Sequence, residues 1–495
     1  MNGIPANSVW PAAVEPAGWT HLVVLVVGVA TVYFATFVGV TSSNDGSHYA
    51  LVRALVERRS FEISPYLAFA ENQDYAAHGD RKFTDRPPGT ALWAAPFYAA
   101  AGLLPAPSRP PPSKHDAGNP RLMGIAAAAA VASALAVGVF WLILRRRFGL
   151  GPYAAGLAAL ALAFGTTTWK YGSVLYSHGI SALLVLGSLY VALGALRCRA
   201  LSSGHGFGLG LLLGGAILVE YSNALFAALV GIAVAAWTLP PGRAWLRGLA
   251  AAVGGGLPPV GFLLLYNQLN FGGPFRLSTF EVDLQRWPNA AGMDTAFATP
   301  LADGLRGMLL WGSNNQGLFL LAPVALLSFP GLPLFWRRFR RECALVIGLF
   351  VVFVLLFAKS TNFNPLTNDG RYLTPFLGLW LIPLAFAVEH ARRRLTGEPA
   401  QLALALVLFG ALWLSVRNQL MHIAFSWNYD LTLSSLTNMS IPPANLRLVL
   451  GTVFPNWPNV WWLWLLLVPP LAAAAGLRHV RGEPGRESAP LARAP

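Results

Sequence analysis

A short polar segment, Ser42–Tyr49, carries two side chains whose types and spacing could do proton-transfer chemistry. Asp45 and His48 are three residues apart, and residues at this separation are neighbours on the surface of a helix. A carboxylate held within reach of a hydroxyl group can accept its proton, which is what a general base does. The alternative is structural, because an aspartate in this position can instead cap a helix. Taken alone, the segment leaves both interpretations of Asp45 open.

A second polar segment combines cations with a rigid turn. It reads Asp80-Arg81-Lys82-Phe83-Thr84-Asp85-Arg86-Pro87-Pro88-Gly89. The two prolines fix the backbone directly after Arg86, and a planar guanidinium held there suits the oxygen atoms of a phosphate group. The alternative is a charged loop lying against lipid headgroups. That alternative explains the charge, but it explains the rigid turn less well.

Further polar groups lie where apolar stretches begin or turn. They are Tyr176, His178, Glu220 and Arg371. An acid at membrane depth is by default a functional hypothesis. Aromatic residues at an interface often form a belt instead, and an arginine there can extend its charge into the headgroups. Together, these groups predict a cavity at one surface of a membrane.

The elements that must position these groups are membrane-spanning helices. The 495 residues have a mean hydropathy of +0.52 and are 11% charged, against roughly 25% in a soluble domain. Stretches that reach or approach the ~20 residues needed to cross a bilayer core include His21–Val40, Leu122–Leu144, Gly179–Leu196, Ala344–Ala358 and Gln401–Leu414. The sequence therefore predicts an all-α polytopic membrane protein with about twelve transmembrane helices.

The basic residues predict the orientation. The formal net charge of +14 does not indicate nucleic-acid binding, because the basic residues lie in short clusters between apolar stretches. The clusters are Arg145–Arg147, Arg197 with Arg199, Arg243 with Arg247, Arg337–Arg341, Arg392–Arg394 and Arg478 with Arg481. Lys and Arg are enriched in cytosolic loops, so the chain is expected to cross the membrane twice between successive clusters. All the polar groups above then face outward.

The predicted orientation divides the chain into cytosolic, membrane-spanning and outer segments. Residues 1–20 and 481–495 are expected to be cytosolic tails, 21–270 a first transmembrane module, 271–316 an outer loop, and 317–480 the C-terminal transmembrane helices. Thr90–Leu104 is short and contains Pro96, and a full crossing would place Arg145–Arg147 outside, so the charge rule favours a re-entrant or membrane-surface hairpin there. Residues 42–120 are then expected to form one outer loop. Within that loop, Tyr49–Glu62 has the spacing of an amphipathic helix lying on the membrane interface. The two cysteines, Cys198 and Cys343, supply neither a disulfide framework nor a metal site.

On these features the chain resembles the multi-spanning GT-C-type glycosyltransferases, most of all the protein O-mannosyltransferase and lipid A aminoarabinose transferase group. The resemblance rests on Asp45 directly after the first apolar stretch, the helix that follows it, the Arg86-Pro87-Pro88-Gly89 turn and the Gly370–Pro375 segment, and it is strongest over the first 270 residues or so. There are two departures. Gly46 follows Asp45 where many relatives have Glu, and Arg86 stands where many have Lys.

The resemblance implies a reaction and roles for residues. A sugar linked to a polyprenyl phosphate passes to the hydroxyl of a glycan, lipid or protein acceptor at the outer face of the plasma (inner) membrane. The anomeric carbon is inverted. A phosphate leaving group does not strictly require a metal and the sequence shows no convincing ligand cluster, so neither a metal nor a cofactor is expected. Asp45 is then the general base, and the donor phosphate is bound by Arg86, Arg371 and Lys82. The substrate pocket includes His48, Asp85, Tyr176, His178 and Glu220.

Three other functions fit part of the pattern. A lipid or sugar transporter or flippase suits a dozen spans, but transporters tend to place polar groups near the bilayer midplane, often in repeated halves. Here those groups gather at the outer rim, and no repeat is evident. A ligase or polymerase that moves whole glycans from a lipid pyrophosphate would use similar cations. A non-catalytic scaffold does not predict Asp45 and Arg86 in their positions.

Overall fold

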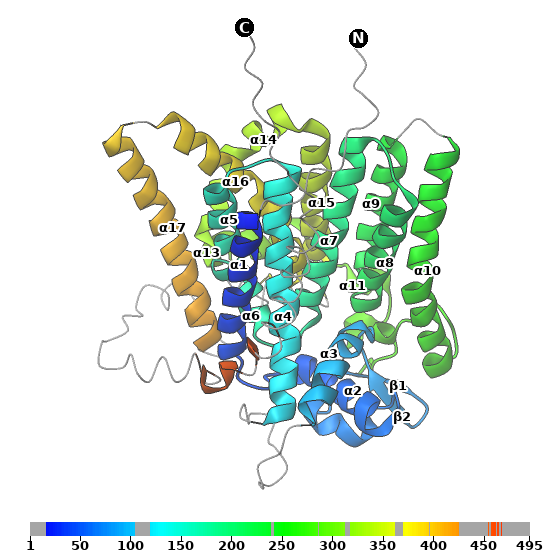
Figure 1. The fold of residues 1–495 in the computed structure, drawn as a ribbon. Helices are drawn as coiled ribbons and strands as arrows, with labels where there is room; N and C mark the ends of the chain where they lie inside the picture. The colour runs from blue at the N-terminus through cyan, green and yellow to red at the C-terminus, as the bar shows by residue number, and fades with distance from the viewer. Residues whose placement is uncertain are drawn as a thin grey trace, which may run out of the picture.

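The chain folds as a bundle of long helices with a smaller lobe at one end (Figure 1). The computed structural model describes residues 16–103, 119–238, 242–285, 287–311, 317–361, 370–395 and 397–424, with a few residues between 454 and 467. Its long helices are α1 (Pro16–Ala35), α4 (Pro120–Leu142), α5 (Pro152–Phe164), α7 (Ser177–Cys198), α8 (Ser203–Val219), α9 (Asn223–Trp237), α10 (Arg243–Phe271), α15 (Arg340–Lys359), α16 (Leu377–Arg394) and α17 (Glu398–Ala424). The predicted all-α polytopic membrane fold is confirmed.

The number of spans is less regular than predicted. Within the described residues, seven helices are long and apolar enough to cross a membrane, and α5, α8 and α9 are shorter apolar helices. Between residues 318 and 338 the chain forms short pieces: α13 (Leu318–Leu321), the 3-10 helix η5 (Pro323–Gly331) and α14 (Leu332–Arg338). Pro323, Pro330 and Pro333 explain the breaks, because proline lacks the N–H that a continuous helix requires. The predicted count of twelve is therefore not established.

The basic clusters gather at one end of the bundle, here called the arginine end. It holds a π-helical turn after α4 (Ile143–Arg147), the last turns of α7, α14 and α16, and the starts of α10 and α15. Contacts join these elements: the Arg197 Nε lies 3.9 Å from a Glu342 carboxylate oxygen, and the Arg146 guanidinium lies 5.7 Å from the Trp19 ring centre. Five predicted clusters lie here, as a shared cytosolic face requires. The sixth, Arg478 with Arg481, lies outside the described residues, as do residues 481–495 and most of 1–20.

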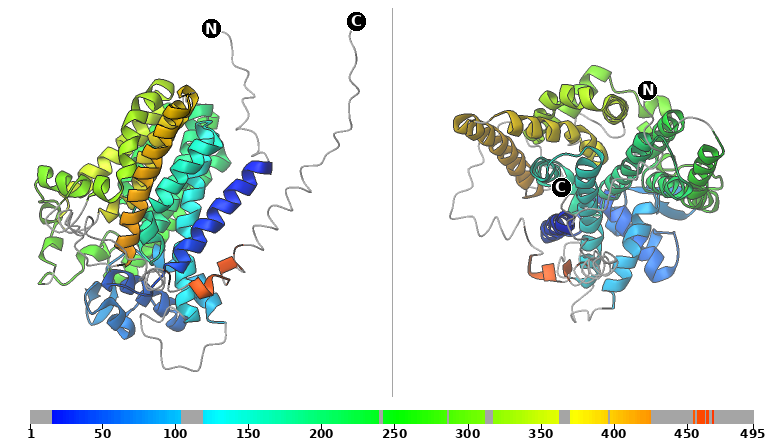
Figure 2. Two further views of the ribbon diagram at one scale, coloured as in Figure 1. Left: turned by 90° about the vertical axis from the view of Figure 1, so that its left-hand side faces the viewer. Right: turned by 45° about the horizontal axis from the view of Figure 1, so that its top comes forward.

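The opposite end, here called the loop end, carries the lobe formed by residues 42–103 (Figures 1 and 2). The lobe contains α2 (Ser43–Arg58), the 3-10 helix η1 (Ser64–Ala70), the hairpin strands β1 (Tyr75–His78) and β2 (Arg81–Thr84), and α3 (Gly89–Ala101). The short elements α6 (Thr168–Gly172), η3 (Ser278–Phe280), η4 (Pro288–Ala290), α11 (Met293–Ala296), α12 (Leu301–Leu309), η6 (Arg371–Phe376) and η8 (Trp457–Asn459) complete the described chain.

Helix α2 differs from the amphipathic interface helix predicted at Tyr49–Glu62. It begins six residues earlier, at Ser43, and residues 44–52 are all buried. Residues 44–48 are polar apart from Gly46, so hydrophobic periodicity could not place them inside the protein. They are buried because they contact other polar groups rather than lipid, as the site below shows.

Glu57, near the end of α2, fixes the lobe to the bundle. Its carboxylate pairs with Arg53 and Arg121 at 3.0 and 2.7 Å and accepts hydrogen bonds from the Tyr66 and Tyr98 hydroxyls at 2.8 and 2.6 Å. Burial opposes the charge, but these hydrogen bonds and cations outweigh it and lower the pKa of Glu57 to about 2. One carboxylate thus joins α2, η1, α3 and α4.

Helix α3 does not cross the bundle, as expected for Thr90–Leu104. The Trp93 Nε1 donates to the Ala128 carbonyl at 2.9 Å, and the Phe97 carbonyl lies against Gly124. Helix α3 therefore runs antiparallel to the first turns of α4 and ends beside the start of that helix. Because α4 starts at the loop end, residues 42–103 stay at that end (Figure 1).

Helices α8 and α10 approach each other closely along a line of small residues. A Cβ at Gly206 would overlap the Gly248 carbonyl, and one at Gly210 would overlap the Ala252 carbonyl. Close backbone contact between small residues is a common way to pack helices in membranes, where no hydrophobic effect drives association. This pair anchors α10, which leads into the segment beside the hairpin.

We expect Gly210→Ala to lower the stability of the protein by about 1–3 kcal/mol, because the added methyl must separate α8 from α10. Gly208→Ala is the matched control, since no atom of the described chain lies within 4 Å of a Cβ at that position on the same helix. Thermal unfolding in detergent measures both. Equal melting temperatures for the two variants would contradict the close packing.

Candidate active site

Asp45 sits in the first turn of α2, where its carboxylate is enclosed by four hydrogen bonds. The backbone N–H groups of Thr41 and Ser42 donate to its two oxygens at 2.7 Å each, and the hydroxyls of the same residues donate at 3.1 and 2.9 Å. With Ser42 as the N-cap, this is a capping box. Burial raises the pKa of Asp45 to about 6, although the four hydrogen bonds oppose the rise.

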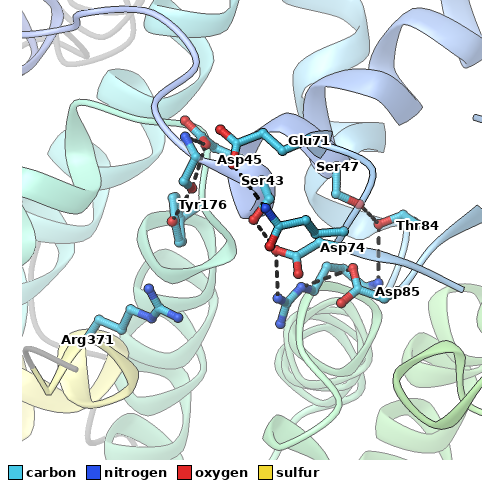
Figure 3. A network of polar contacts seen from close by, with 12 residues as sticks. Ser43, Asp45, Ser47, Glu71, Asp74, Thr84, Asp85, Tyr176 and Arg371 are labelled. Carbon is cyan, nitrogen blue, oxygen red and sulfur yellow. Dashed lines mark hydrogen bonds and ion pairs between the residues drawn. The ribbon is translucent and has the colours of Figure 1, made fainter. Parts of the chain in front are cut away.

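The capping interpretation of Asp45 is thus confirmed, and it does not remove the catalytic one. A carboxylate has about four lone-pair sites, and all four are occupied. The two N–H bonds are fixed by the backbone, but the two hydroxyls can rotate away and yield their places to another hydroxyl. Ser42 Oγ also lies 2.8 Å from the Tyr176 hydroxyl, so the network extends toward α7 (Figure 3). The base role of Asp45 stays a prediction.

Arg86 lies between two carboxylates, one of which the sequence did not indicate. Its Nε is 3.3 Å from an Asp85 oxygen, and its Nη2 is 3.7 Å from an Asp74 oxygen that also accepts the Ser43 hydroxyl at 3.0 Å (Figure 3). Burial opposes the charge of Arg86, but Asp85 and Asp74 outweigh burial and raise its pKa. Ser43 is the first residue of α2, so Arg86 and Asp45 are held against the same turn.

His48 is buried on α2, and its Nδ1 has no hydrogen-bond partner among the described residues. Burial, followed by the charge of Arg86, lowers the pKa of His48 to about 3, so the imidazole is neutral. The neighbouring Ser47 Oγ lies 2.8 Å from Thr84 Oγ1, which accepts the Arg86 backbone N–H at 3.2 Å. A neutral imidazole can both donate and accept, which suits a hydroxyl-bearing ligand better than a charged one.

Arg371 approaches the same region from η6. Its guanidinium carbon lies 5.7 Å from the Tyr176 ring centre and 5.2 Å from that of Tyr372. The His178 ring packs at 5.6 Å from Tyr176 and 5.2 Å from Tyr372. Two aromatic rings therefore lie near the Arg371 guanidinium, and two carboxylates lie near that of Arg86.

Glu220 lies between α8 and α9, within the electrostatic influence of both Arg86 and Arg371. Its carboxylate accepts the Ser177 hydroxyl at 2.5 Å. Burial raises the pKa of Glu220, while Ser177, Arg86 and Arg371 act in the opposite direction. The charges of Arg86 and Arg371 thus both lower the pKa of the same carboxyl group, although 285 residues separate the two arginines along the chain.

Lys82 is placed apart from the other predicted donor-phosphate residues. Its ammonium lies 5.0 Å from the Tyr75 ring centre, and its side chain lines a shallow pocket between the hairpin and residues 280–284. The remaining predicted site residues gather at the loop end around α2. Among the described residues, no three His, Cys, Asp or Glu side chains are arranged to hold a metal ion.

Sequence comparison finds no match, but structure comparison finds solved structures of similar fold. No protein-family model and no curated protein matches the chain. The crystal structure of ArnT from Cupriavidus metallidurans bound to undecaprenyl phosphate is 17% identical, with a TM-score of 0.49, over 94% of this chain and 79% of that one. Archaeal oligosaccharyltransferase AglB from Archaeoglobus fulgidus, in complex with an inhibitory peptide and a dolichol-phosphate, is 12% identical, with a TM-score of 0.52, over 88% of this chain and 59% of that one.

The chain has a GT-C-type fold. At these identities the likeness concerns the fold alone, and the chain spans little more than half the length of AglB. Even so, the GT-C-type resemblance predicted from Asp45 and the Arg86 turn is confirmed at the level of fold. A shared fold does not assign an activity, so a function must be argued from the polar cluster at the loop end.

Proposed function

We propose that the protein transfers a sugar from a polyprenyl phosphate donor to an acceptor hydroxyl at its loop end, with inversion at the anomeric carbon. One observation carries the proposal: acids and arginines from segments as distant as residues 45, 86, 220 and 371 meet at one end of a GT-C-type fold. The structure of AglB, which shares the fold, is of a complex with an inhibitory peptide and a dolichol-phosphate. The loop end is the outer face of the plasma membrane if the arginine end is cytosolic.

The transfer requires a base for the incoming hydroxyl. As the acceptor oxygen bonds to the anomeric carbon, its proton passes to an Asp45 oxygen in place of a Thr41 or Ser42 hydroxyl. The bond from the anomeric carbon to the phosphate oxygen breaks, and its electron pair leaves with the lipid phosphate. Sugar transfer of this kind passes through a state with oxocarbenium character, in which positioned proton acceptors and fixed charges lower the barrier.

The departing phosphate gains charge and needs a fixed cation. Arg86 already pairs with Asp74 and Asp85, so a phosphate would compete with two carboxylates for it. The contacts of Arg371 with Tyr176 and Tyr372 are to ring faces and one hydroxyl. Because two carboxylates already hold Arg86, we assign the main phosphate contact to Arg371 and a supporting one to Arg86. His48, His178 and Tyr176 then face the sugar.

Turnover of a lipid-linked sugar by the purified protein tests the proposal. The protein in liposomes is given polyprenyl phosphates that carry a radiolabelled sugar, with and without a crude envelope extract as the source of acceptor. We expect release of the label, as transferred or hydrolysed sugar with inverted configuration. Movement of intact labelled donor across the liposome membrane without cleavage would favour the transporter alternative.

A further inference from the structure

A pocket of about 440 Å³ opens on the lobe, separate from the cluster around Arg86. It is lined by Tyr75, Ala77 and Lys82 of the hairpin and by residues 280–284. The latter segment extends the sheet, since the Ala77 N–H donates to the Glu281 carbonyl at 2.8 Å and Ala76 bridges to Val282. The volume falls within the range of small-molecule sites.

The pocket lies on the same face of the hairpin as part of the candidate active site. Tyr75 pairs with Thr84 and Ala77 pairs with Lys82 in the antiparallel register, and side chains two residues apart on a strand point the same way. Thr84 contacts Ser47 and the Arg86 backbone. Lys82 precedes Thr84 by two residues, which is about 7 Å along a strand. The same face of the hairpin therefore carries Thr84, next to Arg86, and Lys82, which lines the pocket.

The chemistry of the lining suits a neutral polyhydroxyl ligand. Tyr75 and Phe280 are partly exposed rings, and the Lys82 ammonium makes no ion pair with the described part of the chain. The pocket also holds two acids: Glu281, which is paired with Arg276 at 2.9 Å, and the exposed Asp283. These acids repel an anion, whereas a hydroxyl group can accept from the ammonium and donate to a carboxylate.

We propose that this pocket is an acceptor subsite that binds a sugar ring of the acceptor next to the transferring centre. The inference rests on the proposed function, because an acceptor subsite has meaning only beside a transfer site. The ring packs on Tyr75 and Phe280, and its hydroxyls bond to Lys82 and Asp283. The acceptor class is then a glycan or a glycosylated lipid, and Lys82 recognises the acceptor rather than the donor phosphate.

Lysine NMR tests the subsite without any turnover. The chain has only four lysines, Lys82, Lys114, Lys170 and Lys359, and reductive ¹³C-methylation labels them while keeping their charge. The Lys82 signal is assigned as the one that is lost in Lys82→Arg. Methyl glycosides of glucose, galactose, mannose, arabinose and N-acetylglucosamine are titrated into the protein in nanodiscs, with sodium phosphate as the anion control.

We expect at least one glycoside to shift the Lys82 signal with a Kd of about 1–10 mM, the range of a weak single-ring contact. Asp283→Asn should weaken that binding about tenfold. Arg81→Ala should not, because Arg81 is mostly exposed, pairs with Glu62 and does not line the pocket. No shift with any glycoside, or an equal shift with phosphate, overturns the subsite. If the protein binds a glycoside but never cleaves a lipid-linked sugar, the pocket is a sugar-binding site and the proposal that it binds the acceptor is wrong.

Discussion

Asp45→Asn should lower the rate of sugar transfer by about 10²- to 10⁴-fold, the contribution expected of a positioned general base. Asparagine cannot take the proton of the acceptor hydroxyl. It also offers one carbonyl oxygen to the two backbone N–H groups of Thr41 and Ser42, so the helix cap is weakened as well. The loss of the cap should cost about 1–2 kcal/mol of stability. The transfer assay and thermal unfolding in detergent measure the two effects.

Ser42→Ala separates these effects. It removes the N-cap hydroxyl, with a similar loss of stability, but leaves the Asp45 carboxylate in place. We expect it to lower the rate less than tenfold. If Ser42→Ala is as inactive as Asp45→Asn, Asp45 acts as a cap alone.

The pH dependence of kcat/KM tests the proposed base role of Asp45 independently. Its carboxyl has a pKa near 6, and only the ionised form can accept a proton. The value of kcat/KM should therefore fall as the pH drops through about 6, and this fall should be missing from the residual activity of Asp45→Asn. A wild-type profile that is flat from pH 5 to 8 would remove Asp45 from the proton transfer.

The sequence was sufficient for the helices because their signals are local. Long apolar stretches and flanking arginines predicted α1, α4, α7, α15 and α17 and the end of the bundle at which each begins. Residues 318–338 are the exception within the described chain. They are apolar enough to read as one span, and their prolines break them into three pieces. Hydropathy is averaged over a window of residues, so it does not detect the local effect of a proline, which lacks one backbone N–H and breaks the helix at that residue.

The site was only partly predictable because its contacts are not local. Asp74 carries no sequence signal: it follows Gln73 in an unremarkable polar loop, and its role comes from Ser43 and Arg86, 31 and 12 residues away. Lys82 is a second residue whose surroundings the sequence did not indicate. Its charge and its closeness to Arg86 in sequence suggested a shared phosphate, but strand alternation and the register with Ala77 direct it into the hairpin pocket.

Arg371→Ala should lower kcat by about 10²- to 10³-fold, the loss measured when one fixed stabiliser of a developing negative charge is removed. Thermal unfolding of the same variant in detergent separates a loss of chemistry from a loss of fold. Arg371→Lys should recover part of the rate, since an ammonium keeps the charge but not the planar fork. Single-turnover cleavage of labelled donor in liposomes measures the chemical step.

Arg86→Ala should behave differently, although both residues are arginines predicted to bind the donor phosphate. It leaves the buried Asp74 and Asp85 without their cation, and breaking such a pair costs about 3–5 kcal/mol. We therefore expect a large drop in melting temperature in Arg86→Ala, and a smaller loss of kcat than in Arg371→Ala once the folded fraction is accounted for. If Arg86→Ala stays as stable as the wild type and cleaves donor more slowly than Arg371→Ala, then Arg86 holds the phosphate. Asp74 and Asp85 would in that case release their cation when the donor binds.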